Sequence, residues 1–275
     1  MQLDDFAERV LKPRISQLAS SIDADVATAY KSIYNSVGTP GTTPGTSLVL
    51  LQAQQKLNEF ATPMSPRYAT VNPAANAGLV EGMKGLFNPT DTVSRQFKNG
   101  MMGTGVLGFD EINMSQSIGM HTTGAWGTTI TSTGTLSTQG QATLPISFTG
   151  SSKTWKQGDV FTIADVYAVN PQTRQSTGSL QQFVVTADLT ASSTGTLSIS
   201  PAIYTADHAL ATVDAFPVAT AVVTMLGSAS TQYAQNLSYH KDAITLATAD
   251  LLLPQGVDMA SRQSHNGISM RIVRQ

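Results

Sequence analysis

Hydrophobic residues at the start of the chain recur at steps of three or four positions. The apolar positions of this stretch are Phe6, Val10, Leu11, Ile15, Leu18, Ile22, Val26, Ile33 and Val37. Such spacing places side chains on one face of a helix, so the pattern predicts a long amphipathic helix over residues 4–37. Pro13 either opens its first turn or kinks it, because proline lacks an amide donor and clashes with the carbonyl four residues earlier.

Residues 47–89 predict two shorter helices with a strand between them. The segment 47–60 carries leucines on one side and ends before two prolines, and 67–71 has the composition of a strand. Asn72 and Pro73 are suited to cap and begin a helix over 74–87. Helix, strand and helix in so short a stretch indicate a mixed α+β layer.

The segment 125–227 follows a different pattern. Turn signals recur every eight to twelve residues or so, and between them lie runs rich in β-branched and aromatic residues, at 160–163, 183–186 and 196–199. This alternation predicts a small all-β sandwich or barrel. Further strands are expected near 222–226, 243–253 and 268–273.

Charge also separates this segment from the preceding chain. Residues 1–35 hold nine charged side chains, whereas the whole of 125–227 holds eight: Lys153, Lys156, Asp159, Asp165, Arg174, Asp188, Asp207 and Asp214. The shift indicates a separately folding insert, so the host domain is expected to consist of 1–124 and 228–275. We expect 125–227 to fold when expressed alone.

Composition narrows the functional classes. The chain has 275 residues, a formal net charge of -2 and 12% charged residues, so it lacks the overall basic character of a nucleic-acid or anionic-membrane binder. It has no cysteine, which removes disulfides, thiolate nucleophiles and thiolate zinc sites. The first residues lack the order of a secretion signal, and the most apolar tract, 209–226, is interrupted by Asp214 and Pro217. We expect a soluble, cytoplasmically made product with no membrane or sequence-specific nucleic-acid partner.

Motifs that suggest catalysis lack the context that catalysis needs. The glycines of 103–108 match a dinucleotide-binding fingerprint, but no buried strand precedes them and no acid follows about twenty residues later, so a flexible turn is favoured. Asp110 and Glu111 could bind a cation, although a solvated turn is the preferred interpretation. The histidines are His121, His208, His240 and His265, and none has a partner at metal-binding helical spacing. We expect no enzyme, cofactor or metal.

Large apolar side chains leave two interpretations open. Trp126 and Trp155 are expected to anchor a core, and the alternative is a platform for glycan in a tail or adhesin module. Met101 and Met102 lie in a methionine cluster around the glycine turn, where gap filling is preferred and a contact between subunits is the second possibility.

Several short segments, taken in order, carry a family likeness. They are 30–41, 67–73, 85–89, 100–103, 108–110, 121–124, 168–178, 180–185, 235–237, 240–243 and 267–275. Together they resemble the coat proteins of short-tailed phages of the Salmonella type. The most specific of them, 168–185, lies inside the β-rich insert, and the likeness covers nearly the whole chain.

The resemblance implies the tailed-phage major capsid fold, an HK97-like α+β fold. Its parts are a spine helix, an axial domain, a peripheral sheet and an immunoglobulin-like or telokin-like insertion domain. It also implies a virion subunit, made in the host cytoplasm, that assembles with its own copies, a scaffolding protein and a portal into an icosahedral procapsid and then a DNA-filled head. No catalytic residue is carried over.

Two further expectations come from comparison with the family. The family has an arm and an extended loop before the spine helix and continues beyond the last strand, so both ends are expected to be truncated and the chain to remain a monomer or small oligomer. Within the insert, Asp159, Asp165 and Asp188 are candidates for salt bridges between subunits, although solvated loop acids are the favoured interpretation.

Overall fold

The computed structural model describes residues 12–83, 100, 102–247, 249, 252–256, 259–265 and 268–274. The chain divides into two units, 1–241 and 242–275, and each is described by itself. The first turns of the predicted helix 4–37, the end of the predicted helix 74–87 and Met101 lie outside the described residues.

The helix near the start of the chain ends earlier than its apolar pattern predicted. Helix α2 covers Lys12–Ala27 and continues as the 3-10 helix η2, Thr28–Ser32. Ile33 then has extended backbone angles, φ -97° and ψ 120°, so the prediction of helix to Val37 was wrong. The chain leaves the helix here because the backbone N–H and C=O of Ser36 both form hydrogen bonds with the side-chain amide of Gln182 in the β-rich segment.

The predicted α+β layer is present in the host. Helix α3 covers Leu48–Glu59, strand β1 covers Arg67–Val71 and helix α4 covers Pro73–Gly82. Asn72 caps α4, since its side-chain oxygen accepts a hydrogen bond from the Ala75 amide at 2.8 Å. The predicted cap and proline at the helix start are therefore confirmed.

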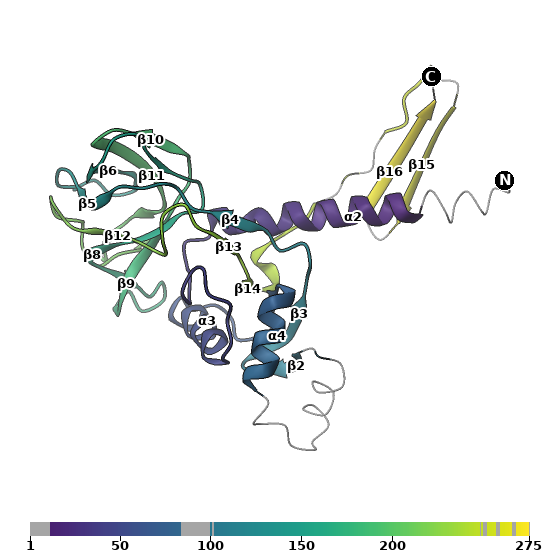
Figure 1. The fold of residues 1–275 in the computed structure, drawn as a ribbon, viewed down its shortest axis with the longest axis horizontal. Helices are drawn as coiled ribbons and strands as arrows, with labels where there is room; N and C mark the ends of the chain where they lie inside the picture. Colours follow the sequence, from purple (N-terminus) through teal and green to yellow (C-terminus); the bar gives the residue numbers. More distant parts are fainter. Residues whose placement is uncertain are drawn as a thin grey trace. The chain divides into compact units, whose positions relative to one another are not determined.

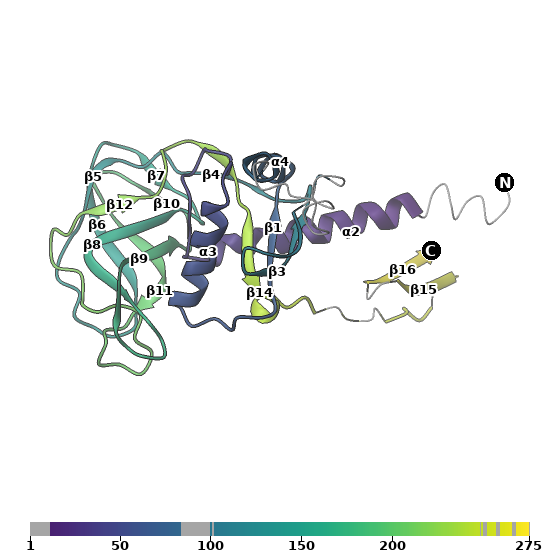
Figure 2. The same cartoon turned by 90° about the horizontal axis from the view of Figure 1, so that it is seen from below.

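A four-stranded sheet lies at the centre of this layer, in the order β14-β1-β3-β2. Besides β1 it contains β2 (Gly103–Val106), β3 (Phe109–Met114) and β14 (Leu237–His240). Strand β1 pairs parallel with β3 and antiparallel with β14, so chain from both sides of the insert builds one sheet. Helices α3 and α4 lie beside this sheet in both views (Figures 1 and 2).

The segment 125–227 forms an antiparallel β-barrel. Its main sheet has the order β12-β8-β9-β11-β6-β5. The strands are β5 (Thr128–Ser132), β6 (Gln141–Thr149), β8 (Val160–Val169), β9 (Ser176–Val185), β11 (Thr194–Ile203) and β12 (Val223–Met225). The two outer strands meet through a Thr131–Val222 bridge and hydrogen bonds between Ser132 and both Thr220 and Ala221. This closure makes the sheet a barrel, one of the two predicted architectures.

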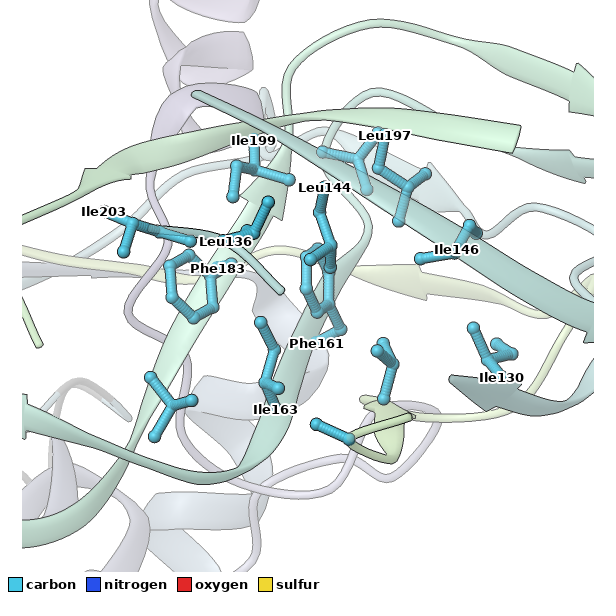
Figure 3. Close-up of a cluster of buried hydrophobic side chains, with 14 of the residues drawn as sticks. Ile130, Leu136, Leu144, Ile146, Phe161, Ile163, Phe183, Leu197, Ile199 and Ile203 are labelled. Atoms are coloured by element: carbon cyan, nitrogen blue, oxygen red, sulfur yellow. The ribbon is translucent and has the colours of Figure 1, made fainter. Parts of the chain in front are cut away.

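Two hydrophobic cores lie in different parts of the chain. The barrel core takes its buried side chains from residues 130–223, with Leu144, Ile146, Phe161, Phe183 and Leu197 all at 0% exposure. Figure 3 shows these side chains converging between the strands. The host core takes its buried side chains from residues 50–112. Each segment therefore has its own apolar interior.

Two short strand pairs complete the first unit. Strand β7 (Lys153–Trp155) pairs with β10 (Leu189–Ala191), and β4 (Met120–Thr122) pairs with β13 (Gln232–Ala234). The second pair joins the segment that enters the barrel to the segment that leaves it. Both connections therefore run side by side at the barrel's base.

The second unit contains a β-hairpin. Strand β15 (Met259–His265) pairs antiparallel with β16 (Ile268–Arg274), which confirms the predicted strand at 268–273. The strand predicted over 243–253 is wrong: η4 covers Lys241–Ala243, and the described residues of 244–256 belong to no strand. A segment with strand propensity forms a strand only where a neighbouring strand pairs with its backbone. Among the described residues, no strand pairs with this segment.

The separate core generates a prediction about the barrel. Residues 125–227 expressed alone should give a dispersed amide spectrum, because the barrel's buried apolar residues all lie within this range. A longer fragment, 119–235, keeps the β4–β13 pair and should melt at a higher temperature. Leu144→Asp, which puts a charge in the core, is the control that should abolish the dispersion. A collapsed spectrum for both unmodified fragments would contradict the prediction.

Candidate functional site

A cluster of buried polar side chains lies where the barrel joins the host. Its centre is Asp159, at the start of β8 and only 1% exposed. The carboxylate accepts hydrogen bonds from the Lys156 amide at 2.7 Å, the Gly124 amide at 3.1 Å and His121 Nε2 at 2.9 Å. Because a buried carboxylate is costly without donors, these three donors explain how the charge is held at the junction.

His121 connects this carboxylate to the host helices. It lies on β4, is 3% exposed, and its Nδ1 is 3.3 Å from the Tyr30 hydroxyl of η2. An ionised carboxylate only accepts hydrogen bonds, so Nε2 carries the proton that is donated to Asp159. The Tyr30 ring also meets the imidazole edge-on, with ring centroids 5.5 Å apart. The cluster therefore joins the host helix η2, through β4, to the turn that precedes barrel strand β8.

The order tyrosine, histidine, carboxylate resembles a catalytic relay, but the electrostatics favour an anchor. Burial, and then the charge of Asp159, raise the pKa of Tyr30 above its ordinary value. An activated nucleophile needs the opposite shift or a base that removes its proton. The Tyr30 phenol therefore stays protonated and acts as a hydrogen-bonding and packing group.

Glycines permit the close approach of the chain at this junction. A side chain at Gly124 would collide with the carbonyl oxygen and carbon of Thr154, so the backbone contact there excludes a Cβ. Gly158 has φ +100°, and a Cβ would lie 3.1 Å from the His121 ring. Both glycines are thus required by the geometry that surrounds Asp159.

Two further contacts tie the barrel to the host. The Gln182 amide of β9 pairs with both backbone groups of Ser36, accepting from its N–H and donating to its C=O, each at 2.9 Å. At the turn after β8, the Asn170 side chain donates to the Glu59 carbonyl at the end of α3, at 2.7 Å. The junction is thus polar at three separate places.

A second buried polar network lies inside the host. Arg67 is 1% exposed, and its guanidinium donates to the carbonyl oxygens of Pro63 and Thr62 and to Asn58 Oδ1 at 2.6–2.7 Å. Burial lowers the pKa of this arginine from its ordinary value. The side chain fixes the loop between α3 and β1, and so the position of the central strand.

The acid pair Asp110–Glu111 lies on strand β3 and not in the turn that we predicted. Asp110 accepts hydrogen bonds from the Arg67 amide at 2.7 Å and from the Ser65 hydroxyl at 3.1 Å. Strand β2 pairs with β3, so the glycines of 103–108 form a β-hairpin and not a loop at a helix start. Neither feature builds the phosphate site that the fingerprint requires.

The predicted contact residues of the insert have different surroundings. Asp159 is buried in the junction, so the solvated-turn interpretation was wrong for it: backbone donors on both sides draw the carboxylate inward. Asp188 is exposed and forms an ion pair with Lys156 at 2.7 Å, which lowers its pKa. Asp165 is exposed, with φ +62°. Met102 is fully buried in the host core. Roles of these residues between subunits stay predictions.

The tryptophans belong to the barrel core. Trp155 is 0% exposed and meets Phe148 edge-on, with ring centroids 4.7 Å apart, while Trp126 is partly buried against the same core. Trp155 therefore presents no surface for a glycan. Among the described residues, no group of histidine and acidic side chains is arranged to hold a metal ion, and none of the described helices is long and apolar enough to cross a membrane.

The junction cluster was missed by sequence reasoning because its members are far apart along the chain. Tyr30, His121 and Asp159 share no regular spacing, and His121 was considered as a metal ligand, for which it has no partner at helical spacing. The available signals were the glycines beside two of them, at 124 and 158, which mark close backbone approach. Which distant polar residues lie next to those glycines can be seen only in the folded structure.

Comparisons with known proteins bear on the whole chain. A family model described as "P22 coat protein - gene protein 5" matches residues 2–275. Among solved structures, the chain is similar to the "CUS-3 coat protein I-domain" at 30% identity, with 36% of this chain and 96% of that chain covered and a TM-score of 0.28. No curated protein matches the chain.

The junction generates a prediction about stability. In Asp159→Asn one carboxylate oxygen becomes an NH2 donor, which faces either the Nε2 proton of His121 or the Gly124 and Lys156 amides, so charge-assisted hydrogen bonds are lost. We expect the free energy of unfolding to fall by about 2 kcal/mol and the melting temperature by several degrees. Asp165→Asn is the control, because this acid is exposed and asparagine tolerates its positive φ. Equal melting curves for the two variants would show that the cluster does not stabilise the fold.

Tyr233 generates a prediction about alkaline pH. Burial, followed by the charge of Asp159, raises its pKa to about 12. Between pH 10 and 12 the folded protein keeps this proton while the unfolded chain loses it, so stability falls as the pH rises. Tyr233→Phe should remove about 1 kcal/mol of that fall, since solvent screens a half-buried group. Denaturant melts at pH 7 provide the control, and identical slopes for both proteins above pH 10 would contradict this assignment.

Proposed function

The chain belongs to the P22 coat protein family, and we propose that it builds the phage shell as an HK97-like host layer that carries its β-barrel as an insertion domain. It is a structural phage coat subunit, located in the capsid of the virion. The single observation that carries this function is a family match over residues 2–275. Self-assembly into a shell follows from that membership.

The strand order of the host sheet supports the proposed arrangement of host and insertion domain. The sheet β14-β1-β3-β2 combines chain from before and after the barrel, as an inserted domain requires. Helix α2 corresponds to the spine helix, and the hairpin β15–β16 to part of the peripheral sheet. An immunoglobulin-like or telokin-like topology stays a prediction, and the contact between β5 and β12 favours the description of this insert as a barrel.

For the barrel we propose two tasks in the shell. It steadies the subunit during folding, because its core is independent and its base is fixed to the host through Asp159, Gln182 and Asn170. It also supplies surface to neighbouring subunits. Tyr30 remains protonated, and we propose that the cluster has no catalytic task.

The proposed partners are those of an assembling capsid. Copies of this chain would associate on a scaffolding protein, incorporate a portal, and form an icosahedral procapsid that becomes the DNA-filled head. Synthesis would take place in the cytoplasm of the bacterial host. These partners are chosen because a coat subunit encloses DNA only within such an assembly.

Assembly is the test of this function. Coexpression with a scaffolding protein from a phage of this family should give closed particles in negative-stain electron micrographs, and the chain alone should sediment as small species. Leu144→Asp is the control, since a subunit with a disrupted barrel core should yield none. If coexpression gives only dispersed subunits at every scaffold ratio, the proposed assembly of this chain on a scaffolding protein is contradicted.

A further inference from the structure

A pocket of about 430 Å³ lies beside the junction cluster. Its walls come from η2, from β4 and from two turns of the barrel, and the side chains that matter most are Lys31, Met120, Lys156 and Asp188. Tyr30 and His121 also line it, so the pocket adjoins the buried anchor. A space of this size accommodates an amino-acid side chain and exceeds the needs of a small inorganic anion.

Not every charged group around the pocket has a partner of opposite charge among the described residues. Lys156 Nζ contacts Asp188 Oδ2 at 2.7 Å, and the Gln157 amide donates to Asp188 Oδ1 at 2.8 Å. The carboxylate of Asp188 is therefore engaged on both oxygens. Lys31 lies close enough to influence Asp188, but within the described part of the chain it forms no ion pair of its own. The other carboxylate nearby, Asp159, is buried and already accepts hydrogen bonds from His121 and two backbone amides. At the surface of the pocket two ammonium groups therefore face the single carboxylate of Asp188.

The concentration of charge here is unusual for this chain. Only eight charged side chains occur in 125–227, and three of them, Lys156, Asp159 and Asp188, lie in or directly beneath this pocket. Lys31 from the host adds a fourth. Charges collected at one place on a weakly charged surface set the register of an association more than its strength.

We propose that this pocket binds an acidic side chain of a second copy of this chain. The carboxylate of that acidic side chain would lie between the ammonium groups of Lys31 and Lys156. Its methylene groups would contact Met120, which is 53% exposed. A peptide side chain uses both the ammonium groups and the thioether, whereas a free anion uses only the former. The proposal rests on the coat function, which places a second copy next to every subunit.

Lys31 provides the first test. Lys31→Gln removes the unpaired ammonium and keeps the Lys156–Asp188 pair, so we expect five- to tenfold weaker association by sedimentation of the full chain assembled with scaffolding protein. The melting temperature of the subunit should not change. Lys153→Gln is the matched control, because it removes an equal charge from β7 outside the pocket. Equal association of the two variants would overturn the proposal.

Zero-length cross-linking provides the second test. Carbodiimide joins a lysine amine to a carboxylate only when the two are in contact, and mixing isotope-labelled with unlabelled subunits separates links between copies from links within one. We expect mixed-label peptides that contain Lys31 or Lys156. Particles that yield only the internal Lys156–Asp188 link would overturn the pocket proposal and leave the coat function intact. Absence of any particles would contradict both.

Discussion

A carboxylate removed from water must be saturated with donors, and the junction between barrel and host depends on this requirement at Asp159. Its three donors come from the turn before β8, from the segment entering the barrel and from β4. The third donor, His121, is in turn fixed by Tyr30 of η2. One buried charge therefore fixes the relative placement of three chain segments that are distant in sequence, at residues 30, 121–124 and 156–159. The glycines at 124 and 158 allow the close approach that this placement needs.

Because the barrel and the host have separate apolar cores, the polar junction between them carries more of the connection. The barrel core and the host core share none of their buried residues, so among the described residues no common hydrophobic interior joins the two parts of the first unit. The connection is instead made by directional contacts, at His121, at Gln182 and at Asn170. Directional bonds specify one geometry sharply, because their energy is lost with small displacements. A shell subunit needs such a specified geometry, since its contacts with many copies must all be satisfied together.

Local patterns predicted most elements and, for α3, β1 and β16, their ends to within one residue. Helices α3 and α4, strand β1 and the barrel strands follow from apolar spacing, capping by Asn72 and β-branched runs, because these signals act within a few residues. The helix beyond Ser32 and the strand over 243–253 were wrong, because Ser36 bonds to a residue 146 positions away and the second segment has no strand partner among the described residues. The junction cluster was not predicted for the same reason, because Tyr30, His121 and Asp159 come together only in the folded chain. The family, by contrast, was recognised from short segments spread over nearly the whole chain, because their order along the sequence carries that information directly.

Closure of the barrel has a consequence for a protein that exists in many crowded copies. An open sheet presents unpaired backbone groups along its outer strands, and these recruit strands from other chains into aggregates. In this insert the end of β5 pairs with residues 220–222, immediately before β12, through the Thr131–Val222 bridge and the hydrogen bonds of Ser132. Neighbouring inserts are thereby prevented from exchanging strands at the concentrations inside a forming particle. Contacts made by the closed wall of the barrel then use side chains, and exposed side-chain contacts are individually weak enough to break and re-form.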